Sequence, residues 1–197
     1  MSRTKREEQR EQTKRLLLQT AQRVFAEKGI MNTRMSDIAQ AAGVSHGTVF
    51  LHFSTQEALI TEVVEAFGGE LAARTHQLAD SKAGLRAVLA AHLESIGEDE
   101  AFYTRLVTES RLLPQAVRDS WVGIKSAISL HFSQAAADGI AAGRVKNIPP
   151  YLLFNTWAGL LHYYLSNSDL FAPTGGIIPR YGEVLINHYM SLVGIKD

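Results

Sequence analysis

The chain has 197 residues, of which 46% are hydrophobic and 20% are charged, a composition typical of a globular protein with a sizeable core. It contains no cysteine, which excludes disulfides and cysteine-based metal sites and fits a reducing cytoplasm. The charged N-terminus lacks the apolar segment of a secretory signal, and no apolar run approaches the ~18 residues that a membrane helix needs. We therefore expect a cytoplasmic protein with no membrane partner.

Charge is distributed unevenly along the chain. Residues 1–52 contain nine Lys and Arg against five Asp and Glu, a net charge of +4, although the whole chain is neutral. A basic N-terminal part on an acidic body is expected where one end of a protein contacts nucleic-acid phosphates. The same asymmetry also arises by chance on solvated surfaces, so charge alone does not decide between the two interpretations.

The N-terminal third predicts three helices. Apolar residues recur at helical spacing over residues 8–28, and Gly29 ends that helix. A second, short helix follows Thr33, whose hydroxyl we expect to cap it. Gly43 ends the second helix, because glycine readily adopts the left-handed conformation of a C-terminal turn.

A third helix follows immediately after this turn. Ser45 is the expected N-terminal cap, and the helix runs to His52 with Val49 and Phe53 facing inward. Two short helices joined by a tight turn are typical of the helix-turn-helix motif, in which the start of the second helix contacts base edges in DNA.

Residues 13–60 resemble the DNA-binding domain of the TetR family of bacterial transcriptional regulators. The matching segments are TKRLLLQTAQRVFAEKGI at 13–30, SDIAQAAGVSHGTVFLHF at 36–53 and STQEALI at 54–60. A lone helix-turn-helix pattern is weak evidence, but about fifty residues in register are specific. The resemblance covers about a quarter of the chain; the rest matches the family only in length and helical character.

The resemblance implies an all-α fold of about nine helices. An N-terminal three-helix DNA-binding domain over residues 1–55 would precede a ligand-binding and dimerisation domain over residues 56–197. It further implies a regulator, by default a repressor, that a small-molecule ligand releases from a palindromic operator in double-stranded DNA. No cofactor is implied.

The resemblance also assigns roles in DNA binding. We expect His46 and Thr48 to contact base edges and Phe50 to pack on sugar or a thymine methyl group. Contacts with phosphates are expected from Thr33, Arg34, Ser45, Gly47 and His52. Because His46 and His52 bind phosphate better when protonated, we expect tighter DNA binding as pH falls from 8 to 6.

The chain departs from the family pattern at three positions. The family often has a basic residue at the position of His46, usually Tyr at that of Phe50, and usually Lys at that of Gln56. Phe50 cannot donate a hydroxyl hydrogen bond and Gln56 donates without charge, so we expect weaker binding to DNA and a flatter salt dependence. Arg34 and the N-terminal arm are available to compensate.

The remainder of the chain reads as helix throughout. Ser54 or Thr55 is expected to cap a fourth helix, within which Gly68 and Gly69 indicate either a bend or close helix packing. Ser81 or Lys82 is expected to open a fifth helix. Later helices are predicted over 99–112, 114–140, 150–166 and 179–193, with a loop at 167–177.

The last two helices are expected to form a subunit interface. Residues 150–166 are apolar on two faces, so one face can pack on its own subunit and the other on a partner. A two-fold four-helix bundle of these helices is the interface usual in the resembled family, although a monomer with an aromatic-rich core gives the same pattern. The interface residues we expect are Leu153, Leu160, Tyr164, Leu185, His188, Tyr189 and Leu192.

The family resemblance also implies a pocket for a small apolar or amphipathic effector, enclosed by the middle helices. Large apolar and amphipathic side chains that should converge there are Phe102, Tyr103, Leu106, Trp121, Lys125, Ile128, Phe154 and Trp157. Such stripes are more often plain core than a ligand site.

No pattern of catalytic or metal-ligating residues is evident. The histidines of the body lie on separate predicted helices without a partner at metal-ligand spacing, and phosphate-loop and nucleophile motifs are missing. A helical enzyme is therefore disfavoured. An adaptor that keeps the fold but binds a protein stays open, and Phe50 and Gln56 give it slight support.

Overall fold

The computed structural model describes residues 4–78 and 84–194. Within those ranges the protein is all-α, as predicted, and its β pairing is limited to one isolated bridge between Val145 and Gly194. The helices are α1 Lys5–Lys28, α2 Met35–Ala42, α3 His46–His52, α4 Gln56–Leu78, α5 Gly84–Ile96, α6 Glu100–Glu109, α7 Gln115–Ala141, α8 Pro150–Ser166, α9 Ser168–Phe171 and α10 Ile177–Val193. A short 3-10 turn, Gly97–Asp99, joins α5 to α6. The predicted opening of the fifth helix at Ser81 or Lys82 lies outside the described residues.

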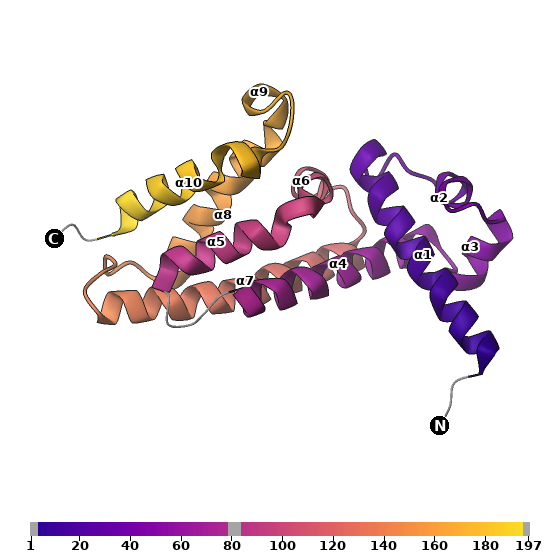
Figure 1. Ribbon diagram of the computed structural model, residues 1–197, viewed down its shortest axis with the longest axis horizontal. Coiled ribbons are helices and arrows are strands. Elements are labelled where there is room, and N and C mark those ends of the chain that lie inside the picture. Colours follow the sequence, from indigo (N-terminus) through magenta and orange to yellow (C-terminus); the bar gives the residue numbers. More distant parts are fainter. Residues whose placement is uncertain (1–3, 79–83, 195–197) are drawn as a thin grey trace.

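Helices α1, α2 and α3 form a small group at one end of the molecule, and α4 runs from this group into the body (Figure 1). In the body α4 packs along α7, and α5 packs on both. Helices α8 and α10 lie at the far end, so the two chain termini are at opposite ends of the molecule (Figure 1). The helix-turn-helix group is thereby presented away from the body.

An aromatic cluster joins the two parts. The ring of Phe102 on α6 lies 6.4 Å from that of Phe25 on α1 and 5.1 Å from that of Phe67 on α4. All three side chains are buried. Aromatic pairs at these separations add to the stabilisation from burial alone, so α1, α4 and α6 share one apolar core.

Three helix boundaries differ from the sequence prediction. Helix α1 begins at Lys5 instead of residue 8, because the Thr4 backbone N–H donates to the Glu7 carboxylate at 2.8 Å and the Thr4 hydroxyl accepts from the Glu7 N–H. Helix α6 ends at Glu109 instead of near Leu112.

Helix α10 begins at Ile177 instead of Pro179. Its first two backbone N–H groups, from Ile177 and Ile178, donate to the carboxylate of Glu100 at 2.6 and 2.9 Å. A negative group on free N–H groups stabilises a helix start. The short helix α9 also interrupts what the sequence predicts as a loop.

The two adjacent glycines of α4 have different surroundings. The helix runs through both without interruption. A Cβ atom on Gly68 would lie 2.1 Å from the side chain of Ile124 on α7, whereas one on Gly69 would meet nothing within 4 Å. Gly68 therefore allows α4 and α7 to approach closely, which favours the packing interpretation over a bend.

This difference predicts opposite effects of two neighbouring substitutions. Gly69→Ala should raise the free energy of unfolding by about 0.5–1 kcal/mol, because alanine favours the helix and restricts the unfolded chain. Gly68→Ala should lower it by about 1–3 kcal/mol, because Ile124 must leave its place. Chemical denaturation followed by circular dichroism measures both, and equal stabilisation by the two would contradict close packing at Gly68.

Candidate nucleic-acid interface and effector region

The turn between α2 and α3 has the predicted geometry. Gly43 ends α2 in the left-handed conformation, with φ 67°. The Ser45 hydroxyl accepts from the backbone N–H of Thr48 at 3.1 Å and so caps α3. Val49 and Phe53 are buried, which fixes the inward face of α3 and leaves the opposite face exposed.

The outward face of α3 combines polar and apolar groups. His46 and Gly47 are exposed at its N-terminal end, and the His46 ring meets the edge of Phe50 at a centroid separation of 4.8 Å. Leu51 is 72% exposed and was not predicted as part of the site. Its place follows from the inward positions, since Leu51 is two residues from both Val49 and Phe53 and so lies on the opposite side of the helix.

A groove of about 570 Å³ separates the start of α1 from α3. Arg6, Glu7 and Arg10 line it from α1, and Thr48, Leu51 and His52 line it from α3. The sequence prediction assigned no role to Arg6 or Arg10 individually. Their guanidinium groups place positive charge beside the recognition helix, where a phosphate would be attracted.

His52 is less suited to proton-linked DNA binding than the sequence prediction assumed. It is partly buried, and burial, followed by the positive charges of Arg10 and Lys14, lowers the pKa of its imidazole below the usual 6.5. In the free protein His52 thus stays neutral over most of the range from pH 8 to 6.

The predicted role of Thr33 is corrected by its surroundings. Thr33 is 1% exposed, and its hydroxyl donates to the carbonyl of Gly29 at 2.7 Å. It neither caps α2 nor presents its side chain to a phosphate. The α2 start is held by Asp37, whose carboxylate accepts from the backbone N–H of Arg34 at 2.8 Å, while Arg34 itself is exposed.

Gln56 also differs from the role implied by the resemblance. Its amide donates to the carbonyl of Thr33 at 2.9 Å and is partly buried. Since this bond joins the start of α4 to the turn before α2, Gln56 positions the helix-turn-helix on α4.

The residues predicted to line an effector pocket are mostly packed as core. Tyr103, Leu106, Trp121, Ile128 and Trp157 are buried. Phe102, also buried, belongs instead to the junction with α1 and α4. Lys125 and Phe154 line an open groove of about 500 Å³ between α7 and α8.

Polar groups cross this apolar region. The Tyr103 hydroxyl lies 3.0 Å from Nε2 of His162, and the Trp157 indole N–H donates to Nδ1 of His92 at 3.1 Å. Burial lowers the pKa of His92 to about 3, and burial together with the charge of Lys125 lowers that of His162 to about 4. Both imidazoles are neutral at pH 7. The sequence prediction treated these histidines only as core or interface residues.

The expected subunit interface needs a correction. Leu153, Leu185 and Tyr189 are 1%, 2% and 0% exposed within a single subunit, and the Tyr189 hydroxyl donates to the Leu153 carbonyl at 2.8 Å. These three side chains pack the α8–α10 contact of their own subunit, so they are not available to a partner.

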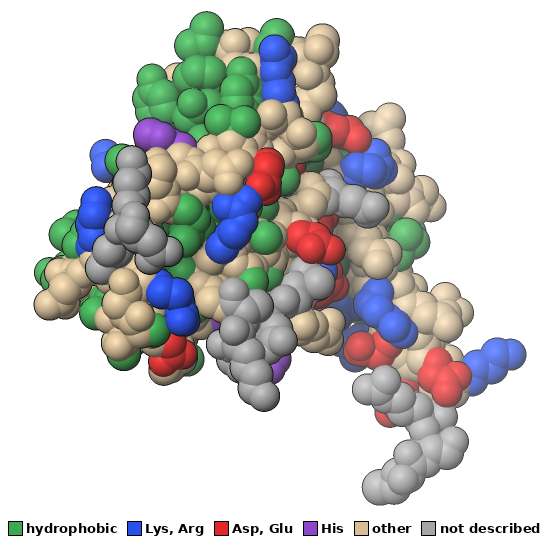
Figure 2. Space-filling model, turned by 60° about the vertical axis from the view of Figure 1, so that its left-hand side comes forward, with side chains coloured by type: hydrophobic (Ala, Val, Ile, Leu, Met, Phe, Trp, Pro, Cys, Tyr) green, Lys and Arg blue, Asp and Glu red, His purple; other side chains and the backbone are tan. Residues whose placement is uncertain are grey.

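The other expected interface residues have accessible surface. Leu160 and Tyr164 are partly buried, and His188 and Leu192 are exposed. On α10 Val184, at 58% exposure, extends the stripe of His188 and Leu192 at helical spacing. Figure 2 shows hydrophobic side chains gathered at the top of the view, the end of the molecule where Figure 1 places α9.

Other classes of site are not evident in the described ranges. Residues 4–78 and 84–194 contain no group of three or more His, Asp or Glu side chains placed to hold a metal ion. None of the helices in these ranges has the length and apolar character needed to cross a bilayer.

Comparison with known proteins agrees with this geometry. Residues 17–63, which include the whole helix-turn-helix, match the bacterial regulatory proteins of the tetR family. The HTH-type transcriptional repressor KstR2 of Rhodococcus jostii is 30% identical over 127 residues, which cover 56% of this chain and 62% of that protein. The similarity thus spans less than two thirds of that relative's length.

Two solved structures have the same fold along nearly the whole chain. A putative transcriptional regulator from Saccharomonospora viridis in complex with choline has a TM-score of 0.75 at 21% identity, with 94% of this chain and 100% of that chain covered. FadR of Bacillus subtilis in complex with stearoyl-CoA has a TM-score of 0.73 at 19% identity, with 89% and 97% covered. Residues 17–63 thus resemble the bacterial regulatory proteins of the tetR family, and the solved structures share the fold of most of the chain.

Proposed function

We propose that the chain is a dimeric transcriptional repressor that binds a palindromic operator and is released by a small-molecule effector. The observation that carries this proposal is the α2–α3 unit, capped by Ser45, whose outward face lies beside the arginine-lined groove of α1. Similarity to a repressor supports the DNA-binding role, and the complexes of fold neighbours with choline and stearoyl-CoA support an effector.

A dimer suits this function because two recognition helices can then contact two half-sites of a palindrome, roughly 34–36 Å apart or a multiple of that distance. The exposed stripe of Val184, His188 and Leu192 on α10 supports an interface formed by the far end of the body. Tyr163 on α8, 59% exposed, adds an apolar group on the neighbouring helix.

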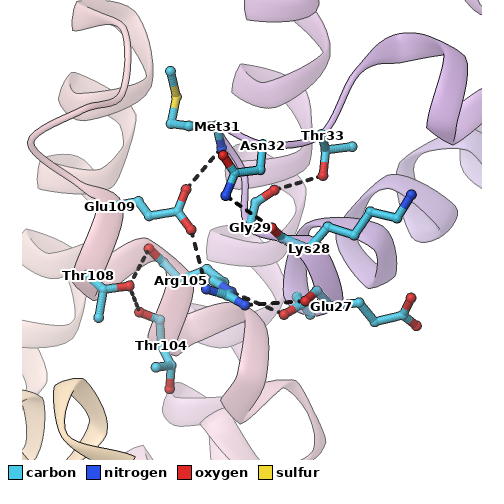
Figure 3. A network of polar contacts seen from close by, with 11 residues as sticks. Glu27, Lys28, Gly29, Met31, Asn32, Thr33, Thr104, Arg105, Thr108 and Glu109 are labelled. Atoms are coloured by element: carbon cyan, nitrogen blue, oxygen red, sulfur yellow. Dashed lines mark hydrogen bonds and ion pairs between the residues drawn. The ribbon is translucent and has the colours of Figure 1, made fainter.

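Release requires that the body and the DNA-binding end change conformation together. Helix α4 is one connection, and polar contacts from α6 provide a second (Figure 3). Arg105 donates to the carbonyls of Ala26 and Glu27 at 3.2 and 3.3 Å, at the C-terminal end of α1. The Glu109 carboxylate accepts from the backbone N–H of Met31 at 2.9 Å, in the turn before α2.

A third contact comes from the 3-10 turn that precedes α6. The carboxylate of Asp99 accepts from Gln22 on α1 and from Arg74 on α4, each at 2.7 Å. We call the bonds that Arg105 and Glu109 make to Ala26, Glu27 and Met31 the α6–α1 contact. An effector that favours a different position of α6 would shift this contact, and DNA and effector affinities would then be reciprocally coupled.

The proposal is tested by selecting bound fragments from random double-stranded DNA, followed by a salt titration on the enriched sequence. We expect a palindromic site and an affinity that falls steeply with salt, since several phosphates are neutralised on binding. If no sequence is enriched, the proposal is wrong, and the exposed Phe50 and Leu51 would instead favour an adaptor that binds a protein.

Two substitutions should separate phosphate contact from base contact. Arg34→Ala removes an exposed charge at the start of α2, so it should weaken binding to operator and random DNA by the same factor. Thr48→Ala should change the preferred sequence, with discrimination altered by about 1–3 kcal/mol at one base pair. Competition binding with operator and random duplexes measures both, and parallel losses in both variants would contradict the division of roles.

The pH dependence of DNA binding should depend on His46. Burial, followed by the charges of Arg10 and Lys14, lowers the pKa of His52, whereas His46 is exposed at the start of α3, where a phosphate can approach it. Between pH 8 and 6 we expect operator affinity to rise by about 1 kcal/mol, roughly fivefold, in the wild type and in His52→Gln. Fluorescence anisotropy should show no such rise in His46→Gln. If operator affinity rises in that variant as it does in the wild type, the role of His46 is contradicted.

Loss of the Glu109 bond should loosen the turn before α2. Glu109→Ala removes the acceptor of the Met31 N–H, so hydrogen exchange of a peptide spanning 29–34 should accelerate about tenfold. Arg111→Met, which removes an exposed charge outside this contact, serves as the control. Identical exchange in Glu109→Ala and the wild type would show that the bond does not hold the turn.

A further inference from the structure

A polar chain crosses the apolar interior of the body from its core to the α7–α8 groove. Its inner end is His92 on α5, 3% exposed. Tyr103 on α6 lies next, with its ring centroid 6.3 Å from that of His92, and its hydroxyl is hydrogen-bonded to His162 on α8. His162 and Lys125 both line the groove. Four helices thus contribute polar groups to this region.

His92, at the inner end of the set of polar groups, has a hydrogen-bond donor without an acceptor. Nδ1 of His92 accepts from the Trp157 indole, so in the neutral imidazole the proton is on Nε2. That Nε2 is buried without a hydrogen-bond partner among the described residues. A buried donor left without an acceptor costs about 1–3 kcal/mol, so a ligand oxygen that reached it would be bound favourably.

The outer end has an uncompensated positive charge. Lys125 is half-buried, and its ammonium lies 5.8 Å from the centroid of the Trp121 ring. No carboxylate lines the groove, and no ion pair of Lys125 occurs in the described ranges. Beside Lys125, the imidazole of His162 is neutral at pH 7, and it would be stabilised in its charged form by a bound anion.

Both polar and apolar residues surround these groups, and the polar ones include Ser126, Ser129 and Asn155. Phe154 and Ala158 of α8 and Val122 of α7 line the groove next to Lys125 and His162. Its volume of about 500 Å³ suits a small organic molecule. An ammonium and an imidazole beside apolar side chains match a molecule with a carboxylate and a hydrocarbon or aromatic remainder.

We propose that the α7–α8 groove is the entry to the effector site and that the effector is an amphipathic organic acid whose carboxylate pairs with Lys125 and His162. Its apolar part lies against Phe154 and Ala158. The role of this ligand as an effector rests on the proposed function, but binding of the acid does not require DNA. Occupation of the polar chain would act on Tyr103 of α6, the helix that also holds the end of α1.

The test uses the intrinsic fluorescence of the full-length protein. The chain has two tryptophans, Trp121 and Trp157, and both adjoin the polar chain. The probes are two pairs matched except for the headgroup, octanoate with octan-1-ol and 4-phenylbutyrate with 4-phenylbutan-1-ol. We expect saturable binding with at least one acid favoured over its alcohol by roughly tenfold, the size of one charge-assisted contact.

Variants identify the residue responsible. Lys125→Met should weaken the acid to the level of the alcohol and leave the alcohol unchanged, while Lys125→Arg should retain the preference. Arg111→Met is the matched control, because it removes a positive charge outside the groove. Equal affinity of acid and alcohol in the wild type, or a preference that survives Lys125→Met, would overturn the assignment; a cooperative thermal transition confirms that each variant is folded.

A separate measurement distinguishes this proposal from the proposed function. Fluorescence anisotropy of an operator duplex reports whether the favoured acid releases the protein from DNA. Binding of the acid at Lys125 without release supports the site and counts against its role as effector site. Specific DNA binding by a protein that shows no preference for the acids supports the regulator and overturns the acid site.

Discussion

The hydrogen bonds from α6 to the end of α1 are the constraint on which the arrangement of the molecule depends. The last turn of a helix has carbonyls without partners inside the helix. In α1 two of these, from Ala26 and Glu27, accept from Arg105 of the body. The turn that follows is held through Met31 by Glu109. Residues of the body therefore hold the segment that leads into the helix-turn-helix, so α4 is not the sole element that sets its orientation.

This constraint connects two regions of different chemical character, the exposed face of α3 and the interior of the body. The outward face of α3 exposes His46, Phe50 and Leu51 beside arginines, in surroundings where charge is solvated. Inside the body, His92 and Tyr103 are polar groups enclosed by apolar side chains. The first arrangement suits a polyanion that is bound through many contacts of low specificity. The second suits a small molecule with few polar atoms. Helix α6 links them indirectly, because Tyr103 lies in the interior of the body and Arg105 bonds the end of α1, which packs on α2.

Local sequence rules predicted the parts of the fold that depend on neighbours in the chain. The Ser45 cap, the left-handed Gly43 and the buried pair Val49 and Phe53 follow from residues within a few positions of one another. Contacts between distant residues could not be predicted in this way. Glu100 of α6 accepts a hydrogen bond from the first residue of α10 and so fixes where that helix begins. The Thr33 hydroxyl is buried and donates to the carbonyl of Gly29. Leu153 and Tyr189 were assigned to a partner because helical spacing identifies an apolar face without saying which subunit covers it.

The central claim, that the α6–α1 contact holds two recognition helices at a fixed spacing in a dimer, is tested most directly by a distance between subunits. The chain has no cysteine, so Gln40→Cys on the exposed side of α2 provides a single spin-label site per subunit. We expect dipolar electron spin resonance to give one narrow distance distribution in the otherwise unchanged protein and a broad one when Arg105→Met and Glu109→Ala are added. The same width in both proteins would contradict the role of α6, and the loss of any dipolar signal between subunits would contradict the dimer.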